Sequence, residues 1–106
     1  MSDATRPCYL LVIAQVTDRA KMGAYAKALA DSGLYAQHGG FYRFIGPAAR
    51  PLEDWPEGQS VVCAEFPSRA AAEAFWFSAT YQTEVKPIRD GAGSIHVALF
   101  EGTPPA

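Results

Sequence analysis

Two charged side chains interrupt segments that are otherwise apolar. Glu65 lies in the apolar run from Val61 to Phe66, and Arg43 stands among aromatic and aliphatic residues between Phe41 and Gly46. A carboxylate in an apolar site can accept a proton as a general base, and a guanidinium can hold an anionic group of a ligand. The same two side chains could instead form a structural ion pair across neighbouring strands. The sequence leaves both interpretations open.

His38 is a further candidate for proton transfer. The imidazole group titrates near neutral pH, so it could act as a general base. His38 also stands directly before Gly39-Gly40, a pair typical of a helix end. A histidine there interacts favourably with the helix dipole and the last carbonyl groups. The capping role is the favoured interpretation, and His38 remains a catalytic candidate beside Glu65.

Four more residues are candidate ligand contacts. Glu53 and Trp55 lie between Pro47 and Gly58, a predicted loop of about a dozen residues, and loops of this length are often functional. Alternatively, this loop serves as a lid or as a dimer contact. Gln15 is the polar interruption of an apolar strand, and Tyr81 is an aromatic residue that could equally belong to the core. With Arg43, these residues make up the predicted substrate-binding set.

The elements that would position these residues follow from periodicity and capping. Alternating or continuous apolar runs predict strands over 8–16, 41–46, 59–66 and 95–100. Helical spacing predicts a helix from the Thr17-Asp18 cap to about Gln37-His38, a second over 69–78, and a short third helix that Pro87 stops. The order βαββαβ predicts an α+β, ferredoxin-like fold, a four-stranded antiparallel sheet with helices on one face. We expect one domain over 8–102 and flexible tails at 1–7 and 103–106.

The strands are apolar on both faces, although helices cover only one. Period-two alternation places Val62, Ala64 and Phe66 on the helix side and Val61, Cys63 and Glu65 on the other. Arg43 is predicted to share that second face with Phe41 and Ile45. A second copy could cover it, so we predict a homodimer in which two sheets pack face to face as an α+β barrel. A cavity between the sheets is then the expected ligand site.

Composition narrows the range of partners. The chain has 106 residues, of which 49% are hydrophobic and 19% charged, and its net charge is -2. Its nine Lys and Arg residues are scattered along the sequence. Nucleic acids and anionic membranes require clustered basic residues, so we expect neither as a partner. Without an apolar run of membrane-spanning length or a recognisable leader, the protein is predicted to be cytoplasmic.

No cofactor or metal is expected from the sequence. It has no glycine-rich phosphate loop, no serine nucleophile elbow and no Cys and His cluster at metal-ligand spacing. Cys8 and Cys63 stand in apolar strand-like runs and are predicted to be reduced, buried thiols.

The chain from Tyr9 to Gly102 resembles the uncharacterised domain-of-unknown-function family 1330, in the dimeric α+β barrel group. The residues that carry the resemblance are Tyr9-Leu10, Gln15-Val16, His38-Gly39-Gly40, Gly46, Glu53, Trp55, Glu65-Phe66-Pro67-Ser68, Ala72, Trp76 to Gln82, Pro87-Ile88-Arg89 and Glu101-Gly102. The resemblance implies a ferredoxin-like fold and a dimer. It implies no reaction, because the family has none assigned.

Two functional classes follow. The first is a cofactor-independent enzyme that acts on a small, partly apolar or aromatic acid in the inter-sheet cavity, where Arg43 would hold the anionic group and Glu65 or His38 would move a proton. The alternative is a non-catalytic small-molecule binding or stress-associated dimer that uses the same cavity. An open inter-sheet pocket with an unpaired acid favours the enzyme, whereas a closed pocket with Glu65 paired to Arg43 removes its site.

Overall fold

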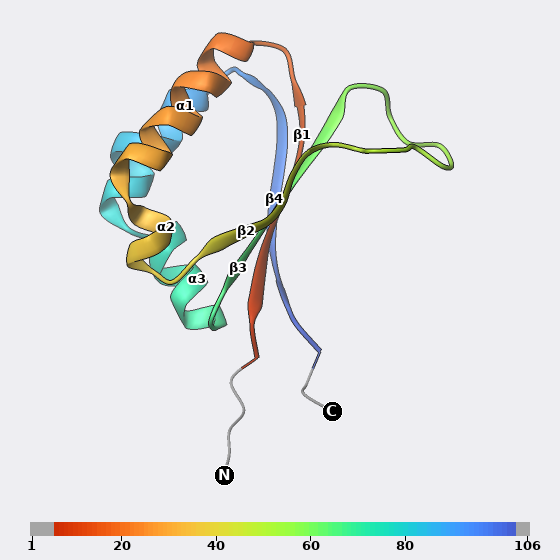
Figure 1. The fold of residues 1–106 in the computed structure, drawn as a ribbon. Coiled ribbons are helices and arrows are strands. Elements are labelled where there is room, and N and C mark those ends of the chain that lie inside the picture. The colour runs from red at the N-terminus through yellow and green to blue at the C-terminus, as the bar shows by residue number, and fades with distance from the viewer. Residues whose placement is uncertain (1–5, 104–106) are drawn as a thin grey trace.

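The computed structural model describes residues 6–103 and has the predicted ferredoxin-like architecture. Four antiparallel strands form one sheet in the order β2-β3-β1-β4, and the helices lie on one side of it (Figure 1). The strands are β1 (Cys8–Val16), β2 (Phe41–Pro47), β3 (Gln59–Phe66) and β4 (Gly93–Glu101). Most of the predicted tails lies outside the described residues, but the Pro7 carbonyl accepts a hydrogen bond from the Gly102 amide at 2.8 Å.

The first helical region is divided by a glycine. Helix α1 (Arg19–Ser32) begins at Asp18, whose carboxylate accepts a hydrogen bond from the Lys21 amide at 3.1 Å. Gly33 has a left-handed backbone, with φ of 70°, and separates α1 from the short helix α2 (Leu34–Gln37). The sequence predicted one continuous helix to Gln37-His38. That prediction was wrong at Gly33, where the backbone conformation suits glycine and interrupts the helix.

The second helical region is longer and less regular than predicted. Ser68 caps α3 (Arg69–Trp76), and the Ser78 hydroxyl accepts a hydrogen bond from the Tyr81 amide at 3.2 Å, as expected of a second cap. A π-helix, η1 (Tyr81–Val85), and a 3₁₀ helix, η2 (Lys86–Arg89), follow. The predicted short helix ends at Val85, as expected, but a separate 3₁₀ helix that the sequence did not predict follows it. Pro87 lies in the first turn of η2, where its missing N–H group would have no helical partner.

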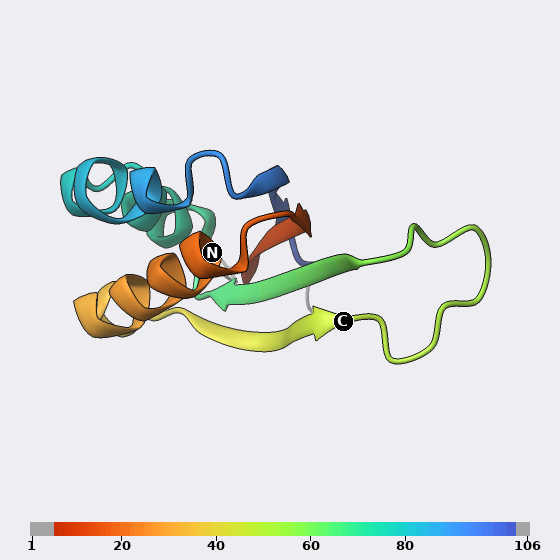
Figure 2. The same ribbon diagram turned by 90° about the horizontal axis from the view of Figure 1, so that it is seen from above.

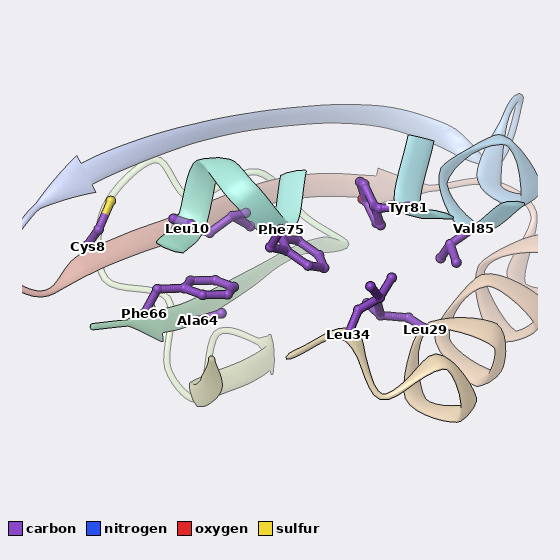
Figure 3. Close-up of a cluster of buried hydrophobic side chains, with 10 residues drawn as sticks. Cys8, Leu10, Leu29, Leu34, Ala64, Phe66, Phe75, Tyr81 and Val85 are labelled. Atoms are coloured by element: carbon purple, nitrogen blue, oxygen red, sulfur yellow. The ribbon is translucent and has the colours of Figure 1, made fainter. Parts of the chain in front are cut away.

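The hydrophobic core lies between the sheet and the helices, and aromatic side chains dominate it (Figure 3). Phe75 is 1% exposed and Phe66 is fully buried, and their rings stack with centroids 5.4 Å apart. Tyr81 lies on the other side of Phe75 at a centroid distance of 4.7 Å. Elements distant in the sequence therefore meet in one cluster, which fixes the spacing between the helices and the sheet.

Strand pairing divides the side chains into a covered face, toward the helices, and a bare face. Val62, Ala64 and Phe66 belong to the covered face, as predicted, since Ala64 and Phe66 are core residues and Val62 lines a cavity beneath the helices. The other row of β3 is on the bare face with its cross-strand partners, which include Tyr9, Leu11 and Ile13 of β1. Directly paired residues of an antiparallel sheet share a face, so this assignment extends across all four strands.

Strand β2 departs from the predicted alternation. Tyr42 pairs with Ala64 and Phe44 pairs with Cys63, so Arg43 is an additional residue in a β-bulge. The bulge reverses the alternation after Arg43 and places Ile45, opposite Val62, on the covered face. The prediction that Ile45 shares a face with Arg43 was therefore wrong.

The bare face exposes large aromatic side chains. Phe41, Phe44 and Phe100 are 47%, 56% and 53% exposed, and all three have cross-strand partners in the bare-face rows. Residues 48–58 connect β2 to β3 as a hairpin arm that extends beyond the sheet, away from the helices (Figures 1 and 2). Leu52 in this arm is 85% exposed. Among residues 6–103, no helix is long and apolar enough to cross a membrane.

Candidate functional site

A small cavity lies between the helices and the covered face of the sheet. Its volume is about 100 Å³, and most of its lining is aliphatic or aromatic. Its walls come from all four strands and from both helical regions, and consist of Leu10, Val12, Met22, Tyr25, Ala26, Leu29, Tyr35, Tyr42, Ile45, Val62, Phe75, Trp76, Tyr81, Arg89, Ile95 and Val97. The cavity is thus built within a single chain, beside the aromatic core.

Tyr25, Tyr81 and Arg89 supply polar groups to this cavity. The hydroxyl oxygens of Tyr25 and Tyr81 are 2.8 Å apart, within hydrogen-bond distance. The Arg89 Cζ atom lies 5.3 Å from the centroid of the Tyr25 ring, a cation–π contact. Helix α1 contributes Tyr25, η1 contributes Tyr81 and η2 contributes Arg89. The cavity is therefore apolar over most of its wall, with a guanidinium and two hydroxyl groups grouped together.

Local structure explains how Tyr81 reaches this position. The Ser78 hydroxyl ends α3 and caps the next turn, and the chain continues from Tyr81 as a π-helix. Tyr81 is 1% exposed, and its ring packs against Phe75 and Trp76. The π-helix is a rare form that frequently occurs at functional sites.

Burial favours the neutral form of three tyrosines that line the cavity. It raises the pKa of Tyr25 and of Tyr35 far above the ordinary value, and it raises the pKa of Tyr42 as well. Burial opposes the charge of Arg89, but its contacts with the Tyr81 and Tyr25 hydroxyls outweigh this effect, and the pKa of Arg89 is raised. At physiological pH the cavity therefore presents neutral hydroxyl groups and one fixed positive charge.

This chemistry suits recognition better than proton abstraction. Among the described residues, no Asp, Glu, His or Cys lines the cavity. A neutral tyrosine can donate or accept a hydrogen bond, and an arginine can pair with an anion, but neither is a base at neutral pH. The residues can bind and orient a small molecule and can donate hydrogen bonds to an oxygen that carries negative charge.

Arg43 and Glu65 pair with each other on the bare face. Arg43 Nε lies 3.5 Å from Glu65 Oε1, and the guanidinium also lies over the Phe41 ring at 5.7 Å. The Glu65 side chain is 21% exposed and that of Arg43 is 56% exposed. The suggested pairing of these two residues is confirmed. Neither residue lines the cavity beneath the helices, and their role in a site between two sheets stays a prediction.

His38 lies at the end of α2. Its Nδ1 atom is 3.0 Å from the Leu34 carbonyl oxygen, and its ring contacts the edge of Phe75 at a centroid distance of 6.2 Å. This geometry is that of the capping interpretation, in which the imidazole satisfies a carbonyl group at the helix end. The cavity lining does not include His38.

The remaining predicted contacts are spread over different parts of the molecule. Tyr81 lines the cavity, whereas Trp55 lies against the outer end of β2 and Glu53 lies in the hairpin arm. The Gln15 side-chain amide is 3.5 Å from the Glu57 carbonyl oxygen, at the base of the arm. Sequence reasoning did not single out Tyr25 or Arg89. The available signals were the helical position of Tyr25 and the Pro87-Ile88-Arg89 segment, which carries part of the family resemblance.

The model of the family described as Domain of unknown function (DUF1330) matches residues 7–103. The chain belongs to this family. No curated protein matches the DUF1330 chain.

Solved structures with low sequence identity have the same fold as this DUF1330 chain. One from Jannaschia sp. CCS1, described as a dimeric ferredoxin-like protein of unknown function, has a TM-score of 0.65 and 24% identity over 91% of this chain and 99% of its own. A "putative antibiotic biosynthesis monooxygenase" from Caulobacter crescentus CB15 has a TM-score of 0.64 and 13% identity, over 95% of this chain and 93% of its own. A structure from Nitrosomonas europaea with the same description has a TM-score of 0.59 and 20% identity, over 99% of this chain and 98% of its own.

Proposed function

We propose that this DUF1330 protein is a homodimer whose subunits each bind a small, partly apolar or aromatic molecule in the cavity between the helices and the sheet. The observation that carries the proposal is the cavity itself, an apolar space in which Arg89 and the Tyr25–Tyr81 hydroxyl pair provide the polar groups. A mostly apolar pocket with a few convergent polar groups is the usual form of a small-molecule site.

The cavity volume limits the size of the ligand. An engineered apolar cavity of about 150 Å³ admits benzene, and drug-sized ligands need roughly 300 Å³ or more. At about 100 Å³, this cavity suits a short chain, or a single ring if surrounding side chains move. Polycyclic ligands and nucleotide-sized ligands are both disfavoured, because either would require the core aromatic cluster to separate.

The bare face supports the homodimer. Exposed phenylalanines on β2 and β4 flank the half-buried apolar side chains of β1, and contiguous apolar patches of this kind mark interaction sites. The Jannaschia structure of the same fold is described as dimeric. A second copy that packs sheet to sheet would cover these residues and the Arg43–Glu65 pair. The site between the sheets predicted from the sequence, with Glu65 as its acid, would then be a second location for a ligand.

Catalysis is the second candidate function. Two structures of this fold are each described as a "putative antibiotic biosynthesis monooxygenase", and the Tyr25–Tyr81 hydroxyl pair could donate a hydrogen bond to an oxygen that becomes negatively charged during a reaction. The test is oxygen consumption during incubation with single-ring phenols and hydroquinones, with the Tyr25→Phe/Tyr81→Phe double variant as control. Catalysis is supported if the wild-type protein consumes oxygen faster than buffer alone and the double variant does not. A rate equal to buffer for every compound argues for binding alone.

Neighbouring residues on opposite faces of β1 provide a test of where a ligand binds. Val12 lines the cavity, whereas Ile13 pairs with Val61 and His96 on the bare face. A thermal-shift screen over small aromatic and aliphatic compounds first identifies a probe. Val12→Phe fills the cavity and should abolish the shift in midpoint, and Ile13→Phe should retain it. The opposite pattern would place the ligand between the sheets and refute the proposal.

A further inference from the structure

Arg89 gives one end of the cavity a positive charge. We infer that Arg89, with Tyr25 and Tyr81, forms an anion-binding end, and that the ligand is a small monoanion with an apolar body, such as a single-ring or short-chain carboxylate. This inference rests on the proposed function, since it names the chemistry of the ligand in the same cavity. Of these three residues, the sequence predicted Tyr81 as a ligand contact and did not select Tyr25 or Arg89.

No carboxylate among residues 6–103 forms an ion pair with Arg89. Ion pairs in the described part of the chain join Lys27 to Asp31, Arg43 to Glu65 and Arg69 to Glu73, and none of them includes Arg89. Arg89 is also the one charged side chain among the described residues that line the cavity. Its contacts are the neutral hydroxyls of Tyr81 and Tyr25 and the face of the Tyr25 ring, which attract the cation without neutralising it. A partly buried guanidinium in this situation gains most from an anion with hydrogen-bond acceptors.

The tyrosine pair can add a hydrogen bond to the same anion. When one of two hydroxyls 2.8 Å apart donates to the other, the acceptor's own proton is not used in that bond. That remaining O–H group can donate to a ligand oxygen beside Arg89. Burial raises the pKa of Tyr25, so its hydroxyl stays protonated and does not repel an anion at neutral pH.

The rest of the wall selects for a single negative charge. The rest of the lining is aliphatic and aromatic, with the hydroxyls of Tyr35 and Tyr42 as further polar groups, and among the described residues it holds no second cation. A second anionic group on the ligand would therefore have no cationic partner, and burying an unpaired charge is costly. Dicarboxylates and phosphate monoesters are therefore poorer ligands than monocarboxylates, and the volume of about 100 Å³ keeps the apolar body small.

Benzoate and benzamide form a suitable pair of probes, because they have nearly the same shape and differ in charge. Titration calorimetry on the wild-type protein should give at least about tenfold tighter binding for benzoate, the effect expected of one charge-assisted hydrogen bond. Butyrate and butyramide repeat the comparison with a chain in place of the ring. In Arg89→Gln the preference for the anion should disappear, while neutral amides still bind. Lys86→Gln is the matched control, since Lys86 is a cation on the same helix that contacts Trp76 from outside the lining.

The outcomes separate the inference from the proposed function. Equal binding of amide and anion, or an unchanged preference in Arg89→Gln, overturns the anion-binding role of Arg89 and leaves small-molecule binding intact. Failure of all four probes to bind overturns both. If Arg89→Gln does not fold, nuclear magnetic resonance of the Arg89 Nε–Hε group in the wild-type protein decides the question. A shift of that resonance with benzoate and not with benzamide supports the inference, and an unchanged resonance refutes it.

Discussion

The covered and bare faces of the sheet both carry aromatic side chains, but these lie in opposite environments. On the covered side, Phe66 and Phe75 are buried in a stacked cluster beneath the helices. On the bare side, Phe41 and Phe44 are about half exposed and border an ion pair. The first arrangement stabilises the fold of one chain. The second contributes little until another molecule covers it.

This difference explains why the two faces have different functional roles in our account. The covered face completes its own binding cavity, because strands and helices of one chain supply all of its walls. The bare face has no opposing wall in a single chain, so any site there requires a partner subunit. A cavity that is complete in one chain can bind a ligand whether or not the protein dimerises.

Phe75→Ala should produce the largest effect on stability. Phe75 is 1% exposed and contacts Tyr35, Phe66 and Tyr81, so its truncation should lower the free energy of unfolding by about 3–5 kcal/mol. Urea denaturation measures this change. Phe77→Ala is the control two residues away, with a side chain 71% exposed, and should change stability by less than about 0.5 kcal/mol. Equal effects of the two variants would contradict the assignment of the core.

Phe44→Asp should weaken association and leave the fold intact. A charge buried between two sheets without a partner costs about 3 kcal/mol or more, which corresponds to a dissociation constant raised more than a hundredfold. Sedimentation at a series of protein concentrations measures it, with Phe77→Asp as the control. A wild-type protein that sediments as a monomer at micromolar concentration, or a Phe44→Asp dimer as stable as the wild type, would eliminate the bare face as the interface.

Removing the hydrogen bond between the tyrosines should have a smaller effect. Tyr25→Phe and Tyr81→Phe should each lower the free energy of unfolding by about 1 kcal/mol, because each leaves one hydroxyl without its 2.8 Å partner. The double variant should lose less than the sum, since both single changes break the same bond. Strict additivity in this double-mutant cycle would mean that the two hydroxyls do not interact.

The Arg43–Glu65 pair should contribute least to the free energy of unfolding while the bare face is exposed. Arg43→Gln or Glu65→Gln in the Phe44→Asp background should change stability by no more than about 1 kcal/mol, because solvent screens an exposed ion pair. A dimer that packs sheet to sheet would desolvate the pair, so the same changes in the wild-type background should alter its dissociation constant. An effect above about 2 kcal/mol in the monomeric background would show that the pair is important within one chain.

Local signals in the sequence predicted most of the fold. Asp18, Ser68 and Ser78 act as helix caps as expected, since a cap depends on a side chain and the backbone groups next to it. The faces of β1 and β3 also followed from alternation. The bulge at Arg43 did not, because it is defined by the register of β2 against β3. Alternation alone cannot reveal where a partner strand skips a residue.

The cavity could not be found from the sequence for a related reason. Tyr25 and Tyr81 are 56 residues apart, and their hydroxyls meet only because α1 and η1 pack over the same sheet face. Sequence reasoning instead selected charged residues within strands, which led to Arg43 and Glu65 on the bare face. Tyr81 was selected as a candidate contact and does line the cavity. Arg89, which also lines the cavity, lies on a 3₁₀ helix that the sequence did not predict.

The position of a bound ligand tests the central claim most directly. Nuclear Overhauser effects can be measured between bound benzoate and assigned methyl groups on the two faces of the sheet. Binding in the cavity predicts contacts with Leu29 and Val97 and none with Leu11 or Ile13. Contacts with Leu11 and Ile13 alone would place the ligand between two sheets and contradict the account.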